Sequence, residues 1–112
     1  MSDIPERDWK VFRRLSDAAG AQFCERALDD VKRAASAPGV NAYDRFGVVG
    51  RLLDERARDF GRAFGDMRRS TALLQILAIR RLGLLDDDAL SQFSEGTQEH
   101  VRRGEEALRP RE

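Results

Sequence analysis

Apolar residues recur every three or four positions through most of the chain, which is the spacing of one face of an α-helix. The pattern predicts four helices, at roughly residues 4–36, 41–65, 67–82 and 86–106. Pro38 and Gly39, then Gly65, then Gly83 separate them, and such residues commonly end helices. We therefore expect an all-α protein, built as a bundle of about four helices.

The segment at residues 67–82 is the most apolar of the four. From Ala72 to Ile79 its one polar residue is Gln75. A helix that is apolar on nearly all sides is buried on nearly all sides, so we expect this helix at the centre of the bundle or of a dimer core. Around it we expect a single domain over residues 1–108, followed by a flexible tail at residues 109–112.

The predicted helices begin at side chains that accept hydrogen bonds from free backbone N–H groups. These side chains are Asp3, Asn41 and Asp66. Gly20 weakens the first helix by about 1 kcal/mol relative to alanine. A bend near residues 16–20 is therefore one outcome, although we favour a continuous helix.

The second predicted helix carries an apolar stripe that runs from Tyr43 to Phe64. Gly47, Gly50 and Gly61 interrupt this helix, each at a cost of about 1 kcal/mol relative to alanine. Such a cost often marks the close approach of another helix. We favour a bend or a tight crossing inside the chain, with a contact between subunits as the alternative.

The charge balance and the single cysteine limit the partners and the compartment that we expect. The chain has 112 residues, of which 41% are apolar and 36% charged, and its formal net charge is zero. Nucleic-acid binders rely on an excess of Lys and Arg, so DNA and RNA are disfavoured. No apolar stretch is long enough to cross a bilayer, and the first ten residues lack the apolar core of a secretory signal. The single Cys24 cannot form an internal disulfide, which is typical of a reducing compartment. From these observations together we expect a cytoplasmic protein without a membrane partner.

Charge is segregated between the last two predicted helices. Residues 67–82 contain four arginines and no acid, whereas residues 83–108 contain seven acids and two arginines. Opposite charges attract across the short distance between neighbouring helices. We expect these two helices to pair, within one chain in the favoured case and between chains in the alternative.

No group of residues has the spacing of a catalytic, metal or cofactor site. The acidic run at residues 86–88 lacks the alternating ligands and the glycine of a calcium loop, and it suits the start of a helix. His100 has no second ligand at metal-binding spacing, and Cys24 is expected to be a buried thiol beside Leu28. We expect neither an enzyme nor a cofactor.

One candidate anion site opens the apolar helix, at Arg68, Arg69, Ser70 and Thr71. Two guanidinium groups, two hydroxyls and free backbone N–H groups can hold a phosphate or the carboxylate of a partner. The simpler interpretation is that the two arginines face solvent and bond Asp66 or other nearby acids.

Residues 70–93 also fit the outline of a helix–turn–helix, with Gly83 in the turn. A recognition helix places its N-terminal residues against bases and close to phosphates. Here those residues would be three aspartates, which phosphates repel. A DNA- or RNA-binding regulator is therefore the least favoured hypothesis.

Three short motifs occur together in the chain: Glu-Arg-Asp-Trp-Lys at residues 6–10, Arg-Arg-Ser at residues 68–70, and an acidic turn that leads to Leu-x-x-Phe-Ser within residues 83–94. In these motifs the chain resembles a group of small bacterial all-helical proteins. The resemblance implies a helical fold of similar length and carries no established activity. It singles out Asp8 and Trp9 as motif positions, in addition to the two arginines.

The sequence thus favours a non-catalytic helical protein-interaction module, an adaptor or regulator that binds a protein partner or a second copy of itself. A homodimer would bury the apolar third helix or the glycine-rich face of the second. One alternative is a small anion- or nucleotide-responsive binding protein that uses Arg68 and Arg69. The other is the disfavoured nucleic-acid regulator.

Overall fold

The computed structural model describes residues 3–110, and these residues contain no strand. Five helices follow one another: α1 (Glu6–Ala35), α2 (Ala42–Phe64), α3 (Ala72–Arg81), α4 (Asp87–Leu90) and α5 (Glu95–Leu108). The all-α class is confirmed. α1 and α2 agree closely with the segments predicted at residues 4–36 and 41–65.

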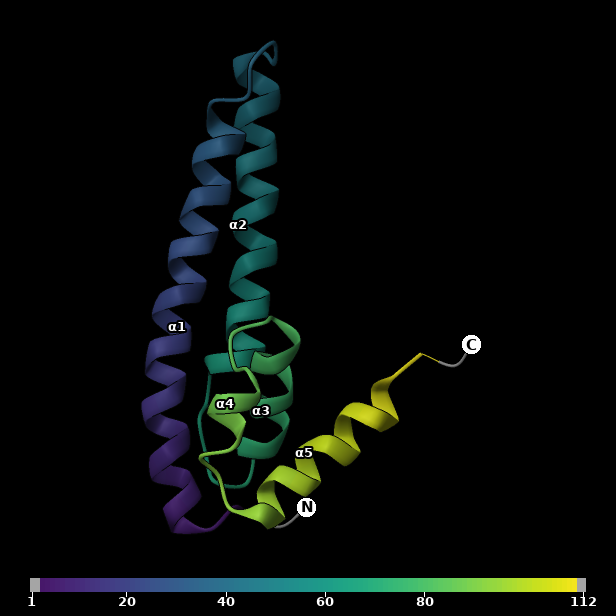
Figure 1. The fold of residues 1–112 in the computed structure, drawn as a ribbon. Coiled ribbons are helices and arrows are strands. Elements are labelled where there is room, and N and C mark those ends of the chain that lie inside the picture. The colour runs from purple at the N-terminus through teal and green to yellow at the C-terminus, as the bar shows by residue number, and fades with distance from the viewer. Residues whose placement is uncertain (1–2, 111–112) are drawn as a thin grey trace.

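The two long helices form an antiparallel hairpin that extends beyond the rest of the molecule (Figure 1), which measures 52 × 35 × 23 Å along its principal axes. Gly39 turns the chain with a φ of 75°, a left-handed conformation that glycine adopts without a steric penalty. α2 begins as predicted at Asn41, whose side-chain oxygen accepts a hydrogen bond from the Asp44 backbone N–H at 2.9 Å. α1 is continuous through residues 16–20.

α3 packs on one end of the hairpin with α4 beside it, and α5 packs on α3 and points away from the hairpin (Figure 1). We call this end, residues 3–23 and 63–110, the base, and we call residues 24–62 the distal hairpin. Every buried apolar side chain among the described residues lies in the base. The side chains with the least exposure are Ile4, Phe12, Ala63, Ala72, Ile76, Ile79, Leu90, Phe93 and Val101. The distal hairpin has no residue in the buried class.

The helix predicted at residues 67–82 begins later, at Ala72, because the preceding residues form a compact turn. Asp66 has a φ of 48°, in the left-handed region, so it does not take the extended backbone of a helix cap. The Thr71 hydroxyl accepts a hydrogen bond from the Arg68 backbone N–H, and the buried Gln75 amide donates to the Gly65 carbonyl at 2.7 Å. These bonds fix the turn in place of a further helical turn.

α3 contacts α1, α2 and α5. Its residues Ala72, Ile76 and Ile79 have no exposed surface, but Leu74 is 56% exposed. The expectation that this segment is buried on nearly all sides is therefore wrong for the side that carries Leu74.

The single helix predicted at residues 86–106 is in fact two helices, α4 and α5. Asp86 caps α4, since its carboxylate accepts a hydrogen bond from the Ala89 backbone N–H at 2.8 Å. The chain then leaves the helix so that Phe93 can enter the core, where it is 2% exposed. Ser94, in an extended conformation, starts α5 in a new direction (Figure 1).

The ends of the chain differ from prediction in small ways. α1 begins at Glu6 with Pro5 at the N-cap position, so Asp3 does not cap it. Arg109 and Pro110 follow the end of α5, and the rest of the predicted tail, residues 111–112, lies outside the described residues. No helix within residues 3–110 has the length and apolar character needed to span a membrane.

Candidate functional site

Asp8, a position singled out from its motif, is fully buried and holds two parts of the fold together. Its carboxylate accepts hydrogen bonds from the Ser94 backbone N–H at 2.8 Å, the Ser94 hydroxyl at 2.6 Å and the Thr97 hydroxyl at 2.6 Å. Because Ser94 and Thr97 open α5, Asp8 ties the start of α5 to α1. Trp9 is half-buried and packs on Phe12. Of the two motif positions, Asp8 is thus in the interior of the base and Trp9 is at its edge.

Burial alone raises the pKa of the Asp8 carboxyl, because it removes water from the charged form. The hydrogen bonds from Ser94 and Thr97, together with the charge of Arg7, act in the opposite direction and outweigh burial. The pKa of Asp8 therefore lies below its usual value, and the carboxylate is charged at neutral pH. A negative charge at the N-terminus of α5 is also favoured by the helix dipole.

The candidate anion site at residues 68–71 precedes α3, and its two arginines have partners within the chain. Arg69 donates through Nε and Nη2 to the Ile4 carbonyl at 3.0 and 2.9 Å. Arg68 pairs with Asp66 at 3.0 Å. Ser70 is exposed, whereas the Thr71 hydroxyl is bonded within the turn. An anion that bound here would compete with these bonds.

Arg80 links α3 to both of the following helices. Its guanidinium pairs with Glu105 at 3.0 Å and with Asp87 at 2.9 Å, and it also donates to the Leu85 carbonyl. Burial alone lowers the pKa of Arg80, but the bonds and charges of Glu105 and Asp87 outweigh burial and raise it. At Arg80, the attraction predicted from charge segregation operates within one chain.

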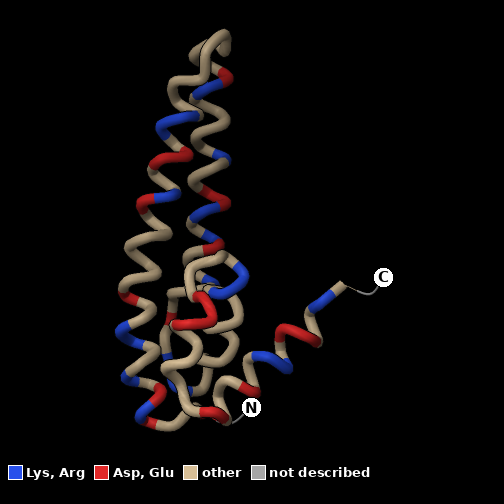
Figure 2. The backbone as a smooth tube through the Cα atoms, in the orientation of Figure 1, with Lys and Arg blue, Asp and Glu red and all other residues tan. Residues whose placement is uncertain are grey.

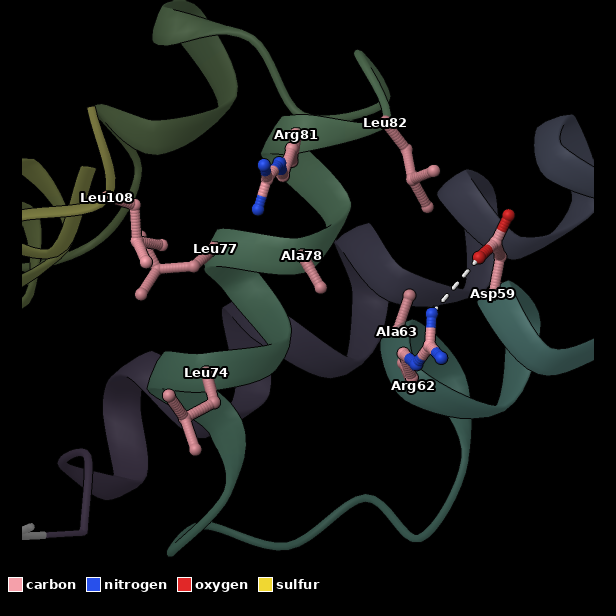
Figure 3. Close-up of a pocket in the computed structure, with 9 residues that line it drawn as sticks. All are labelled: Asp59, Arg62, Ala63, Leu74, Leu77, Ala78, Arg81, Leu82 and Leu108. Atoms are coloured by element: carbon pink, nitrogen blue, oxygen red, sulfur yellow. Dashed lines mark hydrogen bonds and ion pairs between the residues drawn. The ribbon is translucent and has the colours of Figure 1, made fainter. Parts of the chain in front are cut away.

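A shallow groove of about 450 Å³ lies between α2, α3 and the end of α5 (Figure 3). Leu74, Leu77 and Leu108 supply apolar surface, and Arg62 stands opposite them, bonded to Asp59 at 3.5 Å. Leu74 and Leu108 are largely exposed. The groove is the one apolar surface of the base that we consider a candidate for binding.

A second exposed apolar surface lies on one face of the distal hairpin. On α2, Phe46, Leu53 and Phe60 are spaced seven residues apart, so they follow one side of the helix. Phe46 is 83% exposed and Leu53 49% exposed. On α1, the exposed residues of this face are Cys24, Leu28 and Ala35. We call these six residues the distal face.

Two hollows show that the α1 and α2 residues of the distal face lie on the same side of the hairpin. One hollow is lined by Cys24 together with Phe60. The other is lined by Ala35 together with Phe46. Leu28 lies between Cys24 and Ala35 on α1, just as Leu53 lies between Phe60 and Phe46 on α2. The two leucines therefore stand at about the same level, near the middle of the face.

The opposite face of the hairpin is polar and partly covered. Asp30 on α1 pairs with Arg56 on α2 at 3.3 Å, and it also pairs with Arg33. Arg26 donates to the Leu82 carbonyl of the base at 3.3 Å. Figure 2 shows acidic and basic residues spread along both helices of the hairpin. The opposite face thus carries ion pairs, whereas none of the six residues of the distal face is charged.

Two sequence expectations fail on the distal hairpin. Cys24 and Leu28 are exposed rather than buried, because no helix of the base reaches this side. A side chain at Gly50 or Gly61 would meet no other atom within 4 Å. A tight crossing inside the chain therefore does not explain these two glycines.

The chain matches no protein-family model, no curated protein and no solved structure. Among residues 3–110, no group of three or more His, Cys, Asp and Glu side chains could hold a metal ion. Only the geometry and chemistry of the chain's own residues therefore bear on its function. Of the candidate surfaces, the distal face has the most exposed aromatic side chains.

Proposed function

We propose that the protein is a non-catalytic helical protein-interaction module that binds through the distal face. The observation that carries this proposal is the exposure of Phe46, in line with Leu53 and Phe60, on a helix that is otherwise rich in charge. Burial of such a side chain is worth roughly 1.5–3 kcal/mol. A contiguous exposed apolar surface with a polar surround is typical of a protein-binding site.

The difference in burial between the base and the distal hairpin supports the same proposal. In this proposal α3 is the centre of the base, and the base supplies the free energy of folding. Phe46 and Leu53 are 83% and 49% exposed, so they bury little within the chain and folding does not require their size. Their large apolar side chains are then explained by contact with another molecule.

The test is capture of partners by the full-length tagged protein in its own host, with a second, differently tagged copy present to report self-association. We expect the double variant Phe46→Ser/Leu53→Ser not to capture the proteins that the wild-type chain captures. Val48→Ser is the matched control, because Val48 is 41% exposed and lies on another side of α2. If the wild type, the double variant and Val48→Ser all captured the same proteins, the proposal would be contradicted.

The two alternatives gain less support. An anion-responsive protein would have to displace Asp66 from Arg68 and the Ile4 carbonyl from Arg69. A stabilisation by phosphate that disappears in Arg68→Ala/Arg69→Ala would favour it. For a nucleic-acid regulator, the helix that follows α3 has four residues and starts at an aspartate run, a poor recognition helix.

A further inference from the structure

We infer that the partner of the distal face is a second copy of this chain, which lays its own distal hairpin antiparallel on the first. The two hairpins then form a four-helix bundle with a twofold axis at its middle. This inference rests on the proposed function of the distal face and names its partner.

The spacing along α2 makes the distal face complementary to itself. Phe46 and Phe60 each lie seven residues from Leu53, which is about 10.5 Å along a helix. A twofold axis at Leu53 therefore places Phe46 of each copy at the level of Phe60 of the other. Leu53 then meets its own counterpart, and Leu28, at the same level on α1, meets its counterpart too. In a twofold interface the same surface serves both copies.

A hollow of about 440 Å³ stands where the second copy would place its tip. Gly20, Ala21, Phe60 and Phe64 line this hollow at the end of the distal face nearest the base. At the other end, Phe46 and its neighbour Tyr43, which is 92% exposed, project from the tip. The antiparallel arrangement brings the tip of each copy to the hollow of the other. Exposed aromatic side chains thus meet, twice, a recess that is apolar except for Ser16 and Asp17.

Of the two open glycines of α2, Gly50 and Gly61, the same arrangement explains Gly50. Both lie inside α2, where glycine costs about 1 kcal/mol relative to alanine, and the chain itself leaves open space at both. Gly50 lies on the side of α2 between Phe46 and Leu53. A second helix can approach the backbone closely at such a position. This would be the contact between subunits that the sequence analysis gave as the alternative explanation of these glycines.

Charge and area also fit a second copy. The distal hairpin contains seven acids and eight bases. Two hairpins therefore have little net charge to repel each other, and they lack the large basic excess that a nucleic acid or an acidic membrane attracts. With Tyr43 at the tip and Phe64 in the hollow included, the contact extends for about 30 Å along two helices that together are about 20 Å wide. That is about 600 Å² on each copy and about 1,200 Å² in total, above the roughly 1,000 Å² of a specific interface.

Sedimentation velocity of the full chain from low micromolar to submillimolar concentration tests this inference. We expect a shift from the monomer to the dimer mass. In Phe46→Ser/Leu53→Ser the dissociation constant should rise about 100-fold or more, since several apolar side chains lose their burial. Val48→Ser and Leu74→Ser should dimerise like the wild type. A monomer at all concentrations, or a dimer that Leu74→Ser abolishes and Phe46→Ser/Leu53→Ser does not, overturns the inference.

Disulfide cross-linking tests the position of the twofold axis. In a Cys24→Ser chain, Leu53→Cys should give a covalent dimer under mild oxidation, because two cysteines at the axis come within bonding distance. Val48→Cys is the matched control and should remain monomeric under the same conditions. Cross-linking of Val48→Cys in preference to Leu53→Cys would contradict the proposed arrangement.

The results also separate this inference from the proposed function. If the wild type is monomeric throughout, while capture in the host still depends on Phe46 and Leu53, the second copy is the wrong partner and the interaction module stands. If neither sedimentation nor capture depends on these residues, both proposals fail.

Discussion

The base and the distal hairpin share the two longest helices but use them in opposite ways. In the base, Phe12, Ile76 and Phe93 are closed off from water, and buried polar groups such as Asp8 and Gln75 have hydrogen-bond partners. In the distal hairpin the two helices pack mainly on each other, and their contacts to the base are few, such as Phe60 on Phe23 and Arg26 on the Leu82 carbonyl. Their apolar side chains have the helical spacing of a core, yet they face solvent.

Helix length explains the difference. α2 has 23 residues and α3 has 10, so they span about 35 Å and about 15 Å. A helix as short as α3 covers only the part of the hairpin next to it, and α5 points away from the hairpin instead of running along it (Figure 1). The comparison teaches that helical periodicity reveals which side of a helix is apolar, but not what covers that side.

The largest expected effect is on the free energy of unfolding, when an aromatic or branched side chain is truncated in the base and in the distal hairpin. Phe12→Ala should lower the free energy of unfolding by about 3–5 kcal/mol and Ile76→Ala by about 2–5 kcal/mol, because each opens a cavity in the base. Phe46→Ala should change it by less than about 0.5 kcal/mol at dilute concentration, where the chain is monomeric. Urea unfolding measures all three. Equal losses from Phe12→Ala and Phe46→Ala would break the comparison.

The buried carboxylate of the base gives the next largest effect. Asp8→Ala should cost about 3 kcal/mol, since it leaves the Ser94 and Thr97 donors without an acceptor. Hydrogen exchange should increase first in α5, whose start Asp8 holds. Exchange that rises evenly over the whole chain would contradict this specific role.

The lowered pKa of Asp8 also predicts the sign of a pH dependence. A carboxyl whose pKa is lower in the folded chain stabilises the fold fully above its usual pKa, about 3.9. This contribution is lost as the pH falls through the lowered folded-state pKa. Unfolding curves between neutral and strongly acidic pH should therefore fall less steeply for Asp8→Asn than for the wild type. Parallel curves would show that Asp8 makes no such contribution.

A smaller effect is expected at the ion pairs of α3. Arg80→Met should cost about 1–3 kcal/mol, because it removes charged hydrogen bonds to Glu105 and Asp87 from a mostly buried position. Arg81→Met is the control, since Arg81 is exposed and makes no ion pair within the described residues; it should cost under about 0.5 kcal/mol. Thermal unfolding of both variants measures the difference, and equal costs would argue against the bridging role of Arg80.

The smallest effect is expected at Gly50, where one substitution should stabilise the monomer and weaken the dimer. Gly50→Ala should stabilise the monomer by about 0.5–1 kcal/mol, because alanine favours the helix and the space at this position is open. The added methyl group should at the same time weaken the dimer. Gly104→Ala in the base should gain less, since its side chain would come within 2.8 Å of Leu77. Chemical denaturation and sedimentation of each variant measure the two effects.

Local signals predicted the parts of the fold that local contacts determine. The spacing of apolar residues indicates α1 and α2, and Asn41 caps α2 as expected. The break between α4 and α5 was missed, because it involves Asp8 and Ser94, which are 86 positions apart in the sequence. The late start of α3 depends on the left-handed conformation of Asp66, for which its residue type gives no clear signal.

The candidate site was only partly predictable for a related reason. The apolar stripe that contains Phe46, Leu53 and Phe60 is visible in the sequence. Its spacing is that of a buried stripe, and no local feature of the sequence distinguishes a buried stripe from an exposed one. Cys24 was misplaced as a buried thiol on the same assumption. Burial depends on where the short helices of the base end, and that is a property of the whole fold.

Hydrogen exchange of the backbone amides of α2, measured at low and at high protein concentration, tests the central claim most directly. The claim is that the distal face is open in one chain and covered by a second. It predicts that amides between Phe46 and Phe60 exchange more slowly as the concentration rises, while the core of the base keeps the same slow exchange. Exchange in α2 that is independent of concentration would contradict it.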